Sequence, residues 1–224
     1  GVPTGIVGIP FALAVFPVLS TAIAKNDFVS FIKNISSTIR KVFFLIIPIS
    51  IIFLLLRAQI VRVILGRGAF DWQATINTAD ALAMFSLSLF AQSLIPLLGR
   101  AYYTLENTKT PFVMALISEL IAIIAALSLK DVLGVAGLAL AFSIGSILNF
   151  SMLAVGLRLI TKNLEENKIL SSLWKISIAG IIMAVVIQLA KYPLAQWFNM
   201  EKFWGIFLQW LTAGILGLVA YSVI

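Results

Sequence analysis

Long runs without a charged residue recur along this 224-residue chain, and they constrain its fold more than any other feature. Several runs hold about 20 residues, the length that a helix needs to cross the ~30 Å hydrocarbon layer of a membrane. The chain is 61% hydrophobic and 11% charged, whereas a soluble domain has about 45–50% apolar and about 25% charged residues. The sequence therefore predicts an all-α polytopic membrane protein.

Seven segments are predicted to span the membrane, namely 2–24, 42–56, 81–99, 112–129, 132–157, 176–190 and 203–224. Only Lys130 and Asp131 separate the fourth segment from the fifth, which predicts a tight helical hairpin. Helices are expected throughout because backbone groups in lipid need partners within their own segment. The apolar spacing in 26–41 predicts a short helix at the membrane surface, or else an ordinary amphipathic connector.

Positive charges indicate the orientation, because cytoplasmic connections carry an excess of Lys and Arg. The connections after the first, third and fifth spans hold ten such residues and the others hold six. The ten are Lys25, Lys33, Arg40, Lys41, Arg100, Lys109, Arg158, Lys162, Lys168 and Lys175. We therefore expect these connections and the C-terminus to be cytoplasmic. The net charge of +7 reflects topology first and an anionic ligand second, and we expect no nucleic-acid partner.

Residue types that carry common enzyme chemistry are missing. The chain has no Cys and no His, which excludes thiolate chemistry and removes the commonest metal ligand and proton shuttle. It contains no Walker loop, no Ser-His-Asp set and no His-Glu metal motif. We expect no enzymatic activity, no cofactor and no metal. Any uphill transport would draw on an ion gradient, the membrane potential or a gradient of the substrate.

Three prolines in the first span, Pro3, Pro10 and Pro17, recur every seven residues. Each removes a backbone donor and clashes with the preceding turn, so each can bend the helix on roughly the same face. Bent helices suit a protein that alternates between two shapes. The prolines are therefore candidates for gating, and the alternative is a static kink that improves packing.

Glu119 lies eight residues into the fourth span, where a charged carboxylate costs roughly 2.5–3.5 kcal/mol. It is a candidate for coupling transport to a proton or a cation. The alternative is a neutral side chain that forms a hydrogen bond with a neighbouring helix.

Arg57, Arg62 and Arg67 follow the second span at steps of five residues. Guanidinium groups match the geometry of phosphate, so these side chains could meet a phosphate on the outer side. The alternative is that they reach for lipid headgroups at the end of a helix.

The polar stretch RAYYTLENTKTP (100–111) resembles a signature of the bacterial MurJ (MviN) lipid II flippase family. In that signature Arg, an aromatic pair, a short polar turn and Thr-Pro stand in the same order. Three further segments are similar to the family, PTGIVGIPFALAVFPVLS (3–20), IVRVILGRGAF (60–70) and GVAGLALAFSIGSILN (134–149). The signature residues are Arg100, Tyr102, Tyr103, Thr108, Lys109, Thr110 and Pro111.

The resemblance implies a fourteen-span fold of the multidrug/oligosaccharidyl-lipid/polysaccharide (MOP) exporter superfamily, of which this chain would hold spans eight to fourteen. Residues 1–160 would form part of the second lobe, and 161–224 two additional helices that help to form a groove for a lipid tail. The implied activity is transport of lipid II, the undecaprenyl-pyrophosphate-linked peptidoglycan precursor, across the bacterial inner membrane by alternating access. The implied partners are lipid II, membrane lipids and a missing N-terminal half of the same protein.

The resemblance also suggests roles for individual residues. Arg62, Arg67 and Arg100 become the candidates for substrate binding, and Arg100 and Lys109 would hold a cytoplasmic loop through carbonyls and headgroups. Tyr102 and Tyr103 would lie at the membrane interface. Some relatives bind sodium at positions that correspond here to residues without a side-chain oxygen, so no sodium site of that kind is expected. Those positions are Ala122, Ala126 and Phe142.

Other functions remain open at this level. The chain could belong to another MOP-superfamily exporter, for a polyprenyl-linked polysaccharide or a drug. It could be a non-transporting membrane scaffold. A membrane-embedded glycan polymerase or ligase is disfavoured because the predicted outer connections are short.

Overall fold

The computed structural model describes residues 3–65, 72–197 and 203–223, and within these ranges every element is helical. A short π-helix, η1 (Thr4–Gly8), leads into α1 (Ile9–Ala24). The helices that follow are α2 (Phe28–Leu55), α3 (Arg57–Leu65), α4 (Trp72–Ser86), α5 (Leu89–Thr104), α6 (Lys109–Thr161), α7 (Glu166–Trp197) and α8 (Phe203–Val223). The predicted all-α fold is confirmed.

Five helical segments are long and apolar enough to cross a membrane, and the bent pair α4–α5 can supply a further crossing. Helix α6 is 53 residues long and contains a non-helical residue, Gly134, at which the chain folds back. Its two legs can therefore cross separately, and each of the seven predicted spans overlaps a described helix. The chain is a multi-pass integral membrane protein.

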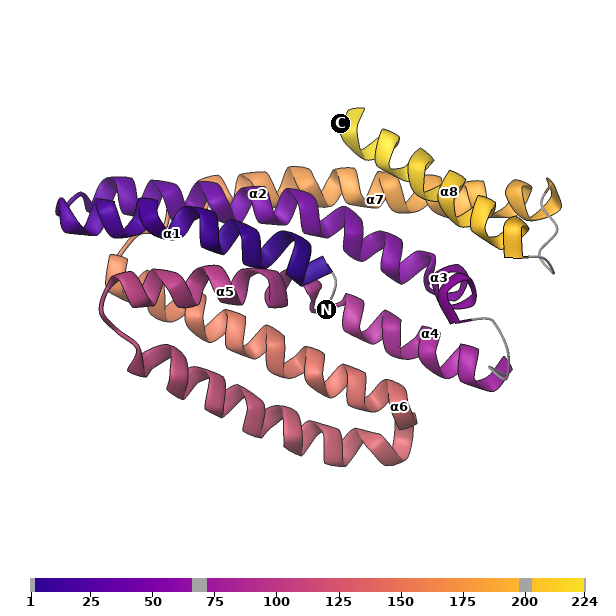
Figure 1. Cartoon of the computed structure of the whole chain (residues 1–224), viewed down its shortest axis with the longest axis horizontal. Helices are drawn as coiled ribbons and strands as arrows, with labels where there is room; N and C mark the ends of the chain where they lie inside the picture. Colours follow the sequence, from indigo (N-terminus) through magenta and orange to yellow (C-terminus); the bar gives the residue numbers. More distant parts are fainter. Residues whose placement is uncertain (1–2, 66–71, 198–202, 224) are drawn as a thin grey trace.

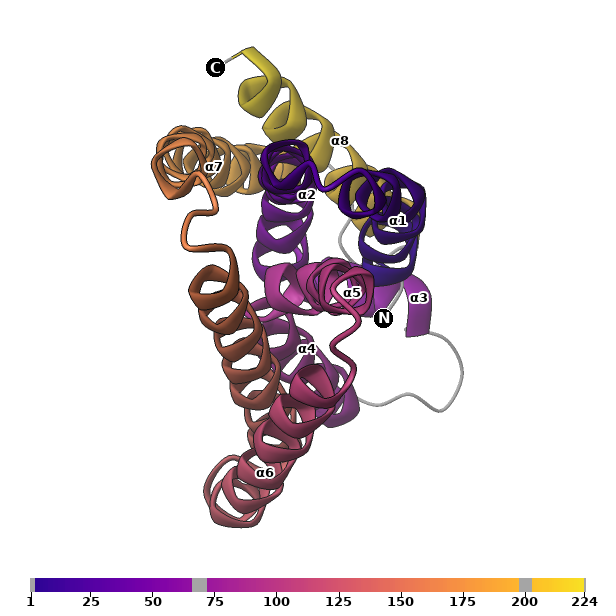
Figure 2. The ribbon, with the colours of Figure 1, turned by 90° about the vertical axis from the view of Figure 1, so that its left-hand side faces the viewer.

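Apart from the short α3, the helices run roughly along the long axis of the molecule (Figure 1). The connections 25–27, 105–108 and 162–165 lie together at one end, which we call the basic end, on the left of Figure 1. Helix α3 and the turn of α6 lie towards the opposite end, which we call the α3 end. Helix α2 is central and packs against α1, α5 and α7. Figure 2 shows α7 and α8 on one side of this centre and α6 beyond α5 on the other.

The segment 26–41 does not form a separate helix at the membrane surface, so that prediction is wrong. Helix α2 is continuous over 28 residues, or about 42 Å. The carboxylate of Asp27 accepts a hydrogen bond from the backbone N–H of Ser30 at 2.9 Å and caps the helix start. The apolar stripe of this segment, including Phe31 and Ile35, is fully buried in the bundle. Protein packing, and not lipid, therefore covers the amphipathic face.

The predicted third span is broken into α4 and α5, which meet at an angle of 44°. Ser88 at the break is buried, and its hydroxyl lies 2.9 Å from that of Ser143 in α6. Ser143 donates to the carbonyl of Met84 at 2.7 Å, and Gln92 donates to the Ser88 hydroxyl at 2.8 Å. These contacts satisfy the backbone and side-chain groups that the break leaves inside the membrane. A continuous third helix was the wrong expectation.

The helical hairpin in α6 is confirmed, but it turns at Gly134 and not at Lys130 and Asp131. Gly134 has φ +55°, a left-handed conformation that glycine adopts without a steric penalty. The two legs pack closely where Gly145 faces Ala122, because an added Cβ on Gly145 would come within 2.7 Å of the Ala122 methyl group. Small residues thus set the spacing of the hairpin.

The start of the first span contains the π-helix η1, which ends two residues before Pro10. Proline has no N–H to donate to the preceding turn, and a local π-turn is one way to adjust to that loss. Gly8 brings η1 against α5, because an added Cβ would lie 2.6 Å from the Ser93 carbonyl oxygen.

Candidate functional site

A groove of about 500 Å³ lies between α1, α2, α7 and α8. Three cationic side chains line it, Arg40 and Lys41 from α2 and Lys175 from α7. The rest of its wall is largely apolar and includes Phe11, Phe44, Leu45, Ile176, Ala179 and Tyr221. We call it the cationic groove. No carboxylate of the described residues is part of its lining.

The helical repeat explains why these residues share one surface. Ser37, Arg40, Lys41 and Phe44 follow one another at three-, one- and three-residue steps, which is one face of α2. Helix α7 contributes a similar series that begins at Ser172. The two faces meet because α2 and α7 pack along much of their length.

The cations lie at the level where the apolar runs begin. Arg40 and Lys41 directly precede the apolar run 42–56, and Lys175 directly precedes 176–190. Charged groups at such a boundary can contact both lipid headgroups and water. The groove therefore combines a positive rim at the membrane boundary with an apolar wall that extends into the hydrocarbon layer.

One carboxylate, Glu165, lies near Arg40 without lining the groove. A hydrogen bond from Lys168 holds the pKa of Glu165 below its usual value, and the positive charge of Arg40 adds to this effect. Among the described residues, nothing accepts a hydrogen bond from the buried Nε of Arg40. The rim keeps a positive excess, with Lys41 and Lys175 both exposed.

Tyr221 closes the groove on the side of α8. Its hydroxyl donates to the carbonyl of Phe44 at 2.9 Å, and the two rings lie 5.4 Å apart between centroids. The end of α8 is thereby attached to α2 directly beside the cationic rim. At the other end of α8, Gln209 donates to the carbonyl of Lys191 and accepts from Gln59.

The structure places Arg100 differently from the prediction. Helix α5 continues to Thr104, so Arg100 lies inside the helix and not in a loop. Its guanidinium lies over the ring of Phe16 in α1, 5.4 Å from the ring centroid. Such a cation–π contact ties α5 to α1. Arg100 does not line the cationic groove.

Tyr102 is not an interface residue, contrary to the prediction, whereas Tyr103 is 51% exposed. The Tyr102 side chain is fully buried, and its hydroxyl donates to the carbonyl of Leu153 at 3.0 Å. Gly156 makes room for it, because a Cβ there would lie 2.5 Å from the hydroxyl oxygen. Tyr102 thus packs in the core and joins α5 to α6, whereas Tyr103 lies on the surface.

The remaining signature residues build the start of α6. Thr108 precedes the helix and Lys109 opens it, and both are exposed. The side chain of Asn107 accepts a hydrogen bond from the backbone N–H of Thr110 at 3.1 Å. Pro111 is buried in the first turn, where the first backbone N–H groups of a helix have no intrahelical partner and proline's missing N–H is tolerated.

Arg57 and Arg62 do not line the cationic groove. Arg62 lies half-buried in α3, and Arg57 forms an ion pair with Asp80 at 3.6 Å. Arg67 lies outside the described residues. The structure brings neither Arg57 nor Arg62 together with Arg100.

Glu119 is exposed on the first leg of α6, and among the described residues no hydrogen bond or ion pair reaches its carboxylate. Pro10 and Pro17 are exposed and Pro3 is buried.

The three positions at which the resemblance predicts no sodium site, Ala122, Ala126 and Phe142, all lie on α6. Ala122 is buried against Gly145, and Phe142 packs edge-on against Phe85 at 5.4 Å. Ala126 is half-buried on the same leg as Ala122. Within the described ranges, no group of three or more carboxylates, His or Cys could hold a metal ion.

Sequence reasoning counted Arg40, Lys41 and Lys175 for orientation and missed that they share a site. The sequence did hold a signal for a shared site. Arg40 and Lys41 directly precede one apolar run and Lys175 directly precedes another, which predicts the same depth in the membrane for all three. The sequence could not indicate that those two helices are neighbours.

Comparison with known proteins places the chain in one family. The family described as lipid II flippase MurJ matches residues 1–208. A probable lipid II flippase MurJ of Thermotoga maritima is 32% identical over 84% of this chain and 37% of its own length. A probable lipid II flippase MurJ of Rickettsia prowazekii is 31% identical over 89% of this chain and 39% of its own length. The lipid II flippase MurJ of Thermosipho africanus is 28% identical over 96% of this chain and 42% of its own length.

A solved structure of lipid II flippase MurJ in an inward closed conformation is also similar. It superposes with a TM-score of 0.76 at 27% identity and covers 99% of this chain and 43% of that one. The chain thus spans about two fifths of the length of the proteins that it matches. The four motif segments, the order of the helices and these matches agree, and the chain belongs to the lipid II flippase MurJ family.

Proposed function

We propose that this chain forms the lipid-tail half of a lipid II flippase, which moves the undecaprenyl-pyrophosphate-linked peptidoglycan precursor from the inner to the outer leaflet of the bacterial cytoplasmic membrane. It acts as a transporter and not as an enzyme. The observation that carries the proposal is the cationic groove, in which Arg40, Lys41 and Lys175 stand over an apolar wall.

The chemistry of the groove matches the two parts of such a lipid. A pyrophosphate cannot enter hydrocarbon without partners, because buried unpaired charge is very costly. Three cations at the membrane boundary would balance it while Phe11, Phe44 and Tyr221 contact the polyprenyl chain. The groove would thus hold the junction between tail and head group.

Transport needs more than this groove. The relatives are longer than this chain by more than half of their own length, and we propose that the rest of the polypeptide completes the cavity for the sugar-peptide head group. Alternating access would then use the bends at Pro3, Pro10 and Pro17. Arg62 and Arg67 would guide the head group on the outer side.

The proposed orientation has the basic end in the cytoplasm. The connections 25–27 and 162–165, the start of α2 and the start of α7 carry most of the Lys and Arg counted for that side. The groove rim is on the same side, where the precursor is synthesised in the inner leaflet. Reaction of single engineered cysteines at Lys33 and at Lys130 with a membrane-impermeant reagent tests this, and labelling of Lys33→Cys from outside intact cells would reverse the orientation.

The function itself is tested in cells depleted of their own flippase and supplied with the full-length protein. The measurement is the fraction of precursor that an externally added, head-group-cleaving enzyme can reach. The triple variant Arg40→Ala, Lys41→Ala and Lys175→Ala should lower this fraction more than tenfold, since like or unpaired charge at a binding site costs several kcal/mol. Lys33→Ala, which removes an exposed charge from the same helix outside the groove, is the matched control.

Full activity of the triple variant at wild-type abundance would refute a role for the groove. Accumulation of another polyprenyl-linked glycan, with lipid II transported normally, would favour another exporter of the superfamily. An unchanged distribution of every lipid-linked precursor on depletion of the protein would favour a scaffold.

We further propose that Glu119 couples transport to an ion gradient, either of protons or of another cation. Its exposed position on α6 leaves its carboxylate free to face the remainder of the polypeptide. Glu119→Gln should then abolish the pH dependence of flipping in the full-length protein. If Glu119→Gln flipped the precursor as fast as the wild type at every pH, Glu119 would have no coupling role.

A further inference from the structure

A second cavity, of about 570 Å³, lies on the other side of the contact between α2 and α7. Its floor is a cluster of aromatic rings, in which Phe90 stacks on Phe43 at 6.1 Å and meets Phe150 edge-to-face at 5.7 Å between centroids. Its sides are the apolar faces of α6 and α7, including Val155 and Leu170. The volume is within the range of small-molecule sites, about 300–1,000 Å³. We call it the paired-charge crevice.

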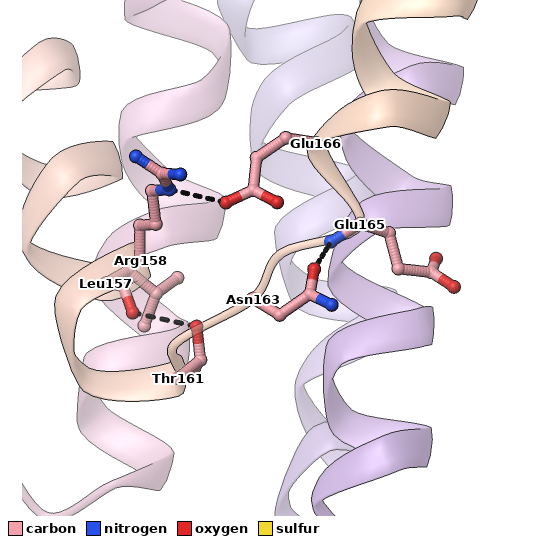
Figure 3. A network of polar contacts seen from close by, with 6 residues as sticks. All are labelled: Leu157, Arg158, Thr161, Asn163, Glu165 and Glu166. Carbon is pink, nitrogen blue, oxygen red and sulfur yellow. Dashed lines mark hydrogen bonds and ion pairs between the residues drawn. The ribbon is translucent and has the colours of Figure 1, made fainter.

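The crevice exists because α6 and α7 diverge. The connection 162–165 reverses the chain with two left-handed residues, Lys162 (φ 62°) and Glu165 (φ 53°). The side chain of Asn163 accepts a hydrogen bond from the backbone N–H of Glu165 at 2.7 Å, which orders the turn (Figure 3). Helix α7 then packs on α2 and α8, while α6 packs on α4 and α5. The space between α6 and α7 is the crevice.

The rim of the crevice carries one positive and one negative charge. The Nε of Arg158 donates to the carboxylate of Glu166 at 2.5 Å, and one of the two terminal guanidinium nitrogens points away from that carboxylate (Figure 3). In the described part of the chain, Nε alone among the Arg158 nitrogens makes a hydrogen bond. Arg158 follows directly on the apolar run 132–157, so the pair lies at the level where the hydrocarbon layer ends.

The charges at this rim select against a dianion. A pyrophosphate here would meet Arg158 but also the carboxylate of Glu166, with which Arg158 is already paired. A headgroup with one phosphate and one ammonium matches the pair, because the phosphate can bind the free face of Arg158 while the ammonium approaches Glu166. A primary ammonium can donate hydrogen bonds to that carboxylate, and a quaternary one cannot.

We propose that the paired-charge crevice binds a membrane phospholipid with a zwitterionic, primary-ammonium headgroup. One acyl chain lies on the aromatic floor formed by Phe43, Phe90 and Phe150. The headgroup lies over Arg158 and Glu166 and bridges the two helices that diverge there. The site is separate from the cationic groove and does not depend on the transported substrate.

Photolabelling tests the proposal. The purified full-length protein is placed in phosphatidylcholine vesicles with one of three lipids that carry the same photoactivatable acyl chain, namely phosphatidylethanolamine, phosphatidylcholine or phosphatidylglycerol. Mass spectrometry measures adducts on 150–158 and 166–177 relative to 112–129, the largely exposed first leg of α6. Phosphatidylethanolamine should label the crevice roughly two- to fivefold more than the other two lipids, the range that a partly exposed charge pair supports.

Three variants separate specific binding from ordinary lipid contact. Glu166→Gln should remove the preference for phosphatidylethanolamine, while Glu106→Gln, an exposed carboxyl at the same end outside the crevice, should keep it. Ala154→Phe should fill the crevice and lower labelling by all three lipids. Unchanged adducts on 112–129 and an unchanged melting temperature show that each variant is folded.

Equal labelling of the crevice by the three lipids would overturn the proposal. So would labelling no greater than that of 112–129, or a preference for phosphatidylethanolamine that survives in Glu166→Gln.

Discussion

The cationic groove and the paired-charge crevice flank the same helix contact, yet their rims carry different charges. Both have an apolar wall, and both open at the level where apolar runs end. The groove presents Arg40, Lys41 and Lys175 without a lining carboxylate, whereas the crevice presents Arg158 already paired with Glu166. The comparison teaches that apolar shape makes both sites suitable for lipid chains, and that the rim charges decide which headgroup each can hold.

Exchanging the charges should break this difference and should have the largest effect of any change at the two sites. In Lys175→Glu the groove gains a carboxylate, so flipping by the full-length protein should fall more than tenfold, because like charges across a contact cost several kcal/mol. In Glu166→Lys the crevice gains a second cation, and its lipid preference should move to phosphatidylglycerol. Flipping by Lys175→Glu is measured as the accessibility of the precursor from outside, and the lipid preference of Glu166→Lys is measured by photolabelling. An unchanged preference in Glu166→Lys would mean that the rim charges do not select the headgroup.

Wedging α7 away from α2 should disturb both sites together. An added Cβ on Gly180 would lie 2.9 Å from the end of the Ile51 side chain, so Gly180→Leu forces the helices apart. Overpacking of this kind costs about 1–3 kcal/mol, measured as a lower thermal midpoint in detergent. Gly214→Leu is the control, because nothing lies within 4 Å of a Cβ there. Equal destabilisation by the two variants would contradict the close contact.

Two tyrosines offer a finer comparison. Tyr221 donates to a carbonyl beside the groove and Tyr102 donates to one between α5 and α6. Each Tyr→Phe change should cost about 0.5–1.5 kcal/mol, with the larger loss for Tyr102, whose hydroxyl is in the more buried side chain. Chemical denaturation measures both. Only Tyr221→Phe should also weaken substrate crosslinking in the groove, and the same weakening in Tyr102→Phe would show a general effect on stability.

The smallest expected effect is that of low pH on the stability of the turn 162–165, which lies between the two sites. The hydrogen bond from Lys168 lowers the pKa of Glu165 from its usual 4.5. A lowered folded-state pKa means that the interaction stabilises the protein fully at neutral pH and loses its effect as the pH falls through that pKa. Hydrogen exchange in 162–168 should therefore accelerate as the pH falls below 4.5, and Glu165→Gln should show the faster exchange already at neutral pH. If hydrogen exchange in Glu165→Gln accelerated at the same pH as in the wild type, Glu165 would not be the group responsible.

Much of the fold could be predicted from apolar run length, because the hydrocarbon layer demands it. The hairpin between the fourth and fifth spans was predicted for the same reason. Its exact turn was not, because Gly134 lies within an apolar run and only its left-handed backbone marks the reversal. The break at Ser88 had no local signal, since neither Pro nor Gly is there. A partner 55 residues away, Ser143, stabilises it.

The candidate site was less predictable than the fold. The signature stretch that identified the family has mainly a structural role here, with Tyr102 in the core and Arg100 on the ring of Phe16. The groove residues were visible only as positive charges on one side of the membrane. Their convergence depends on α7 packing against α2, more than a hundred residues earlier in the chain.

The sequence by itself determined that the chain lies in a membrane, how many times it can cross, and which family it resembles. These properties follow from run length, charge asymmetry and local motifs, all of which are read along the chain. Only the tertiary structure decided which charges share a surface and which side of α2 each site occupies. It pairs Arg158 with Glu166, whereas Lys175 lines a groove whose described lining holds no carboxylate. The physical reason is that helix neighbours are chosen by packing between distant segments, which no local pattern records.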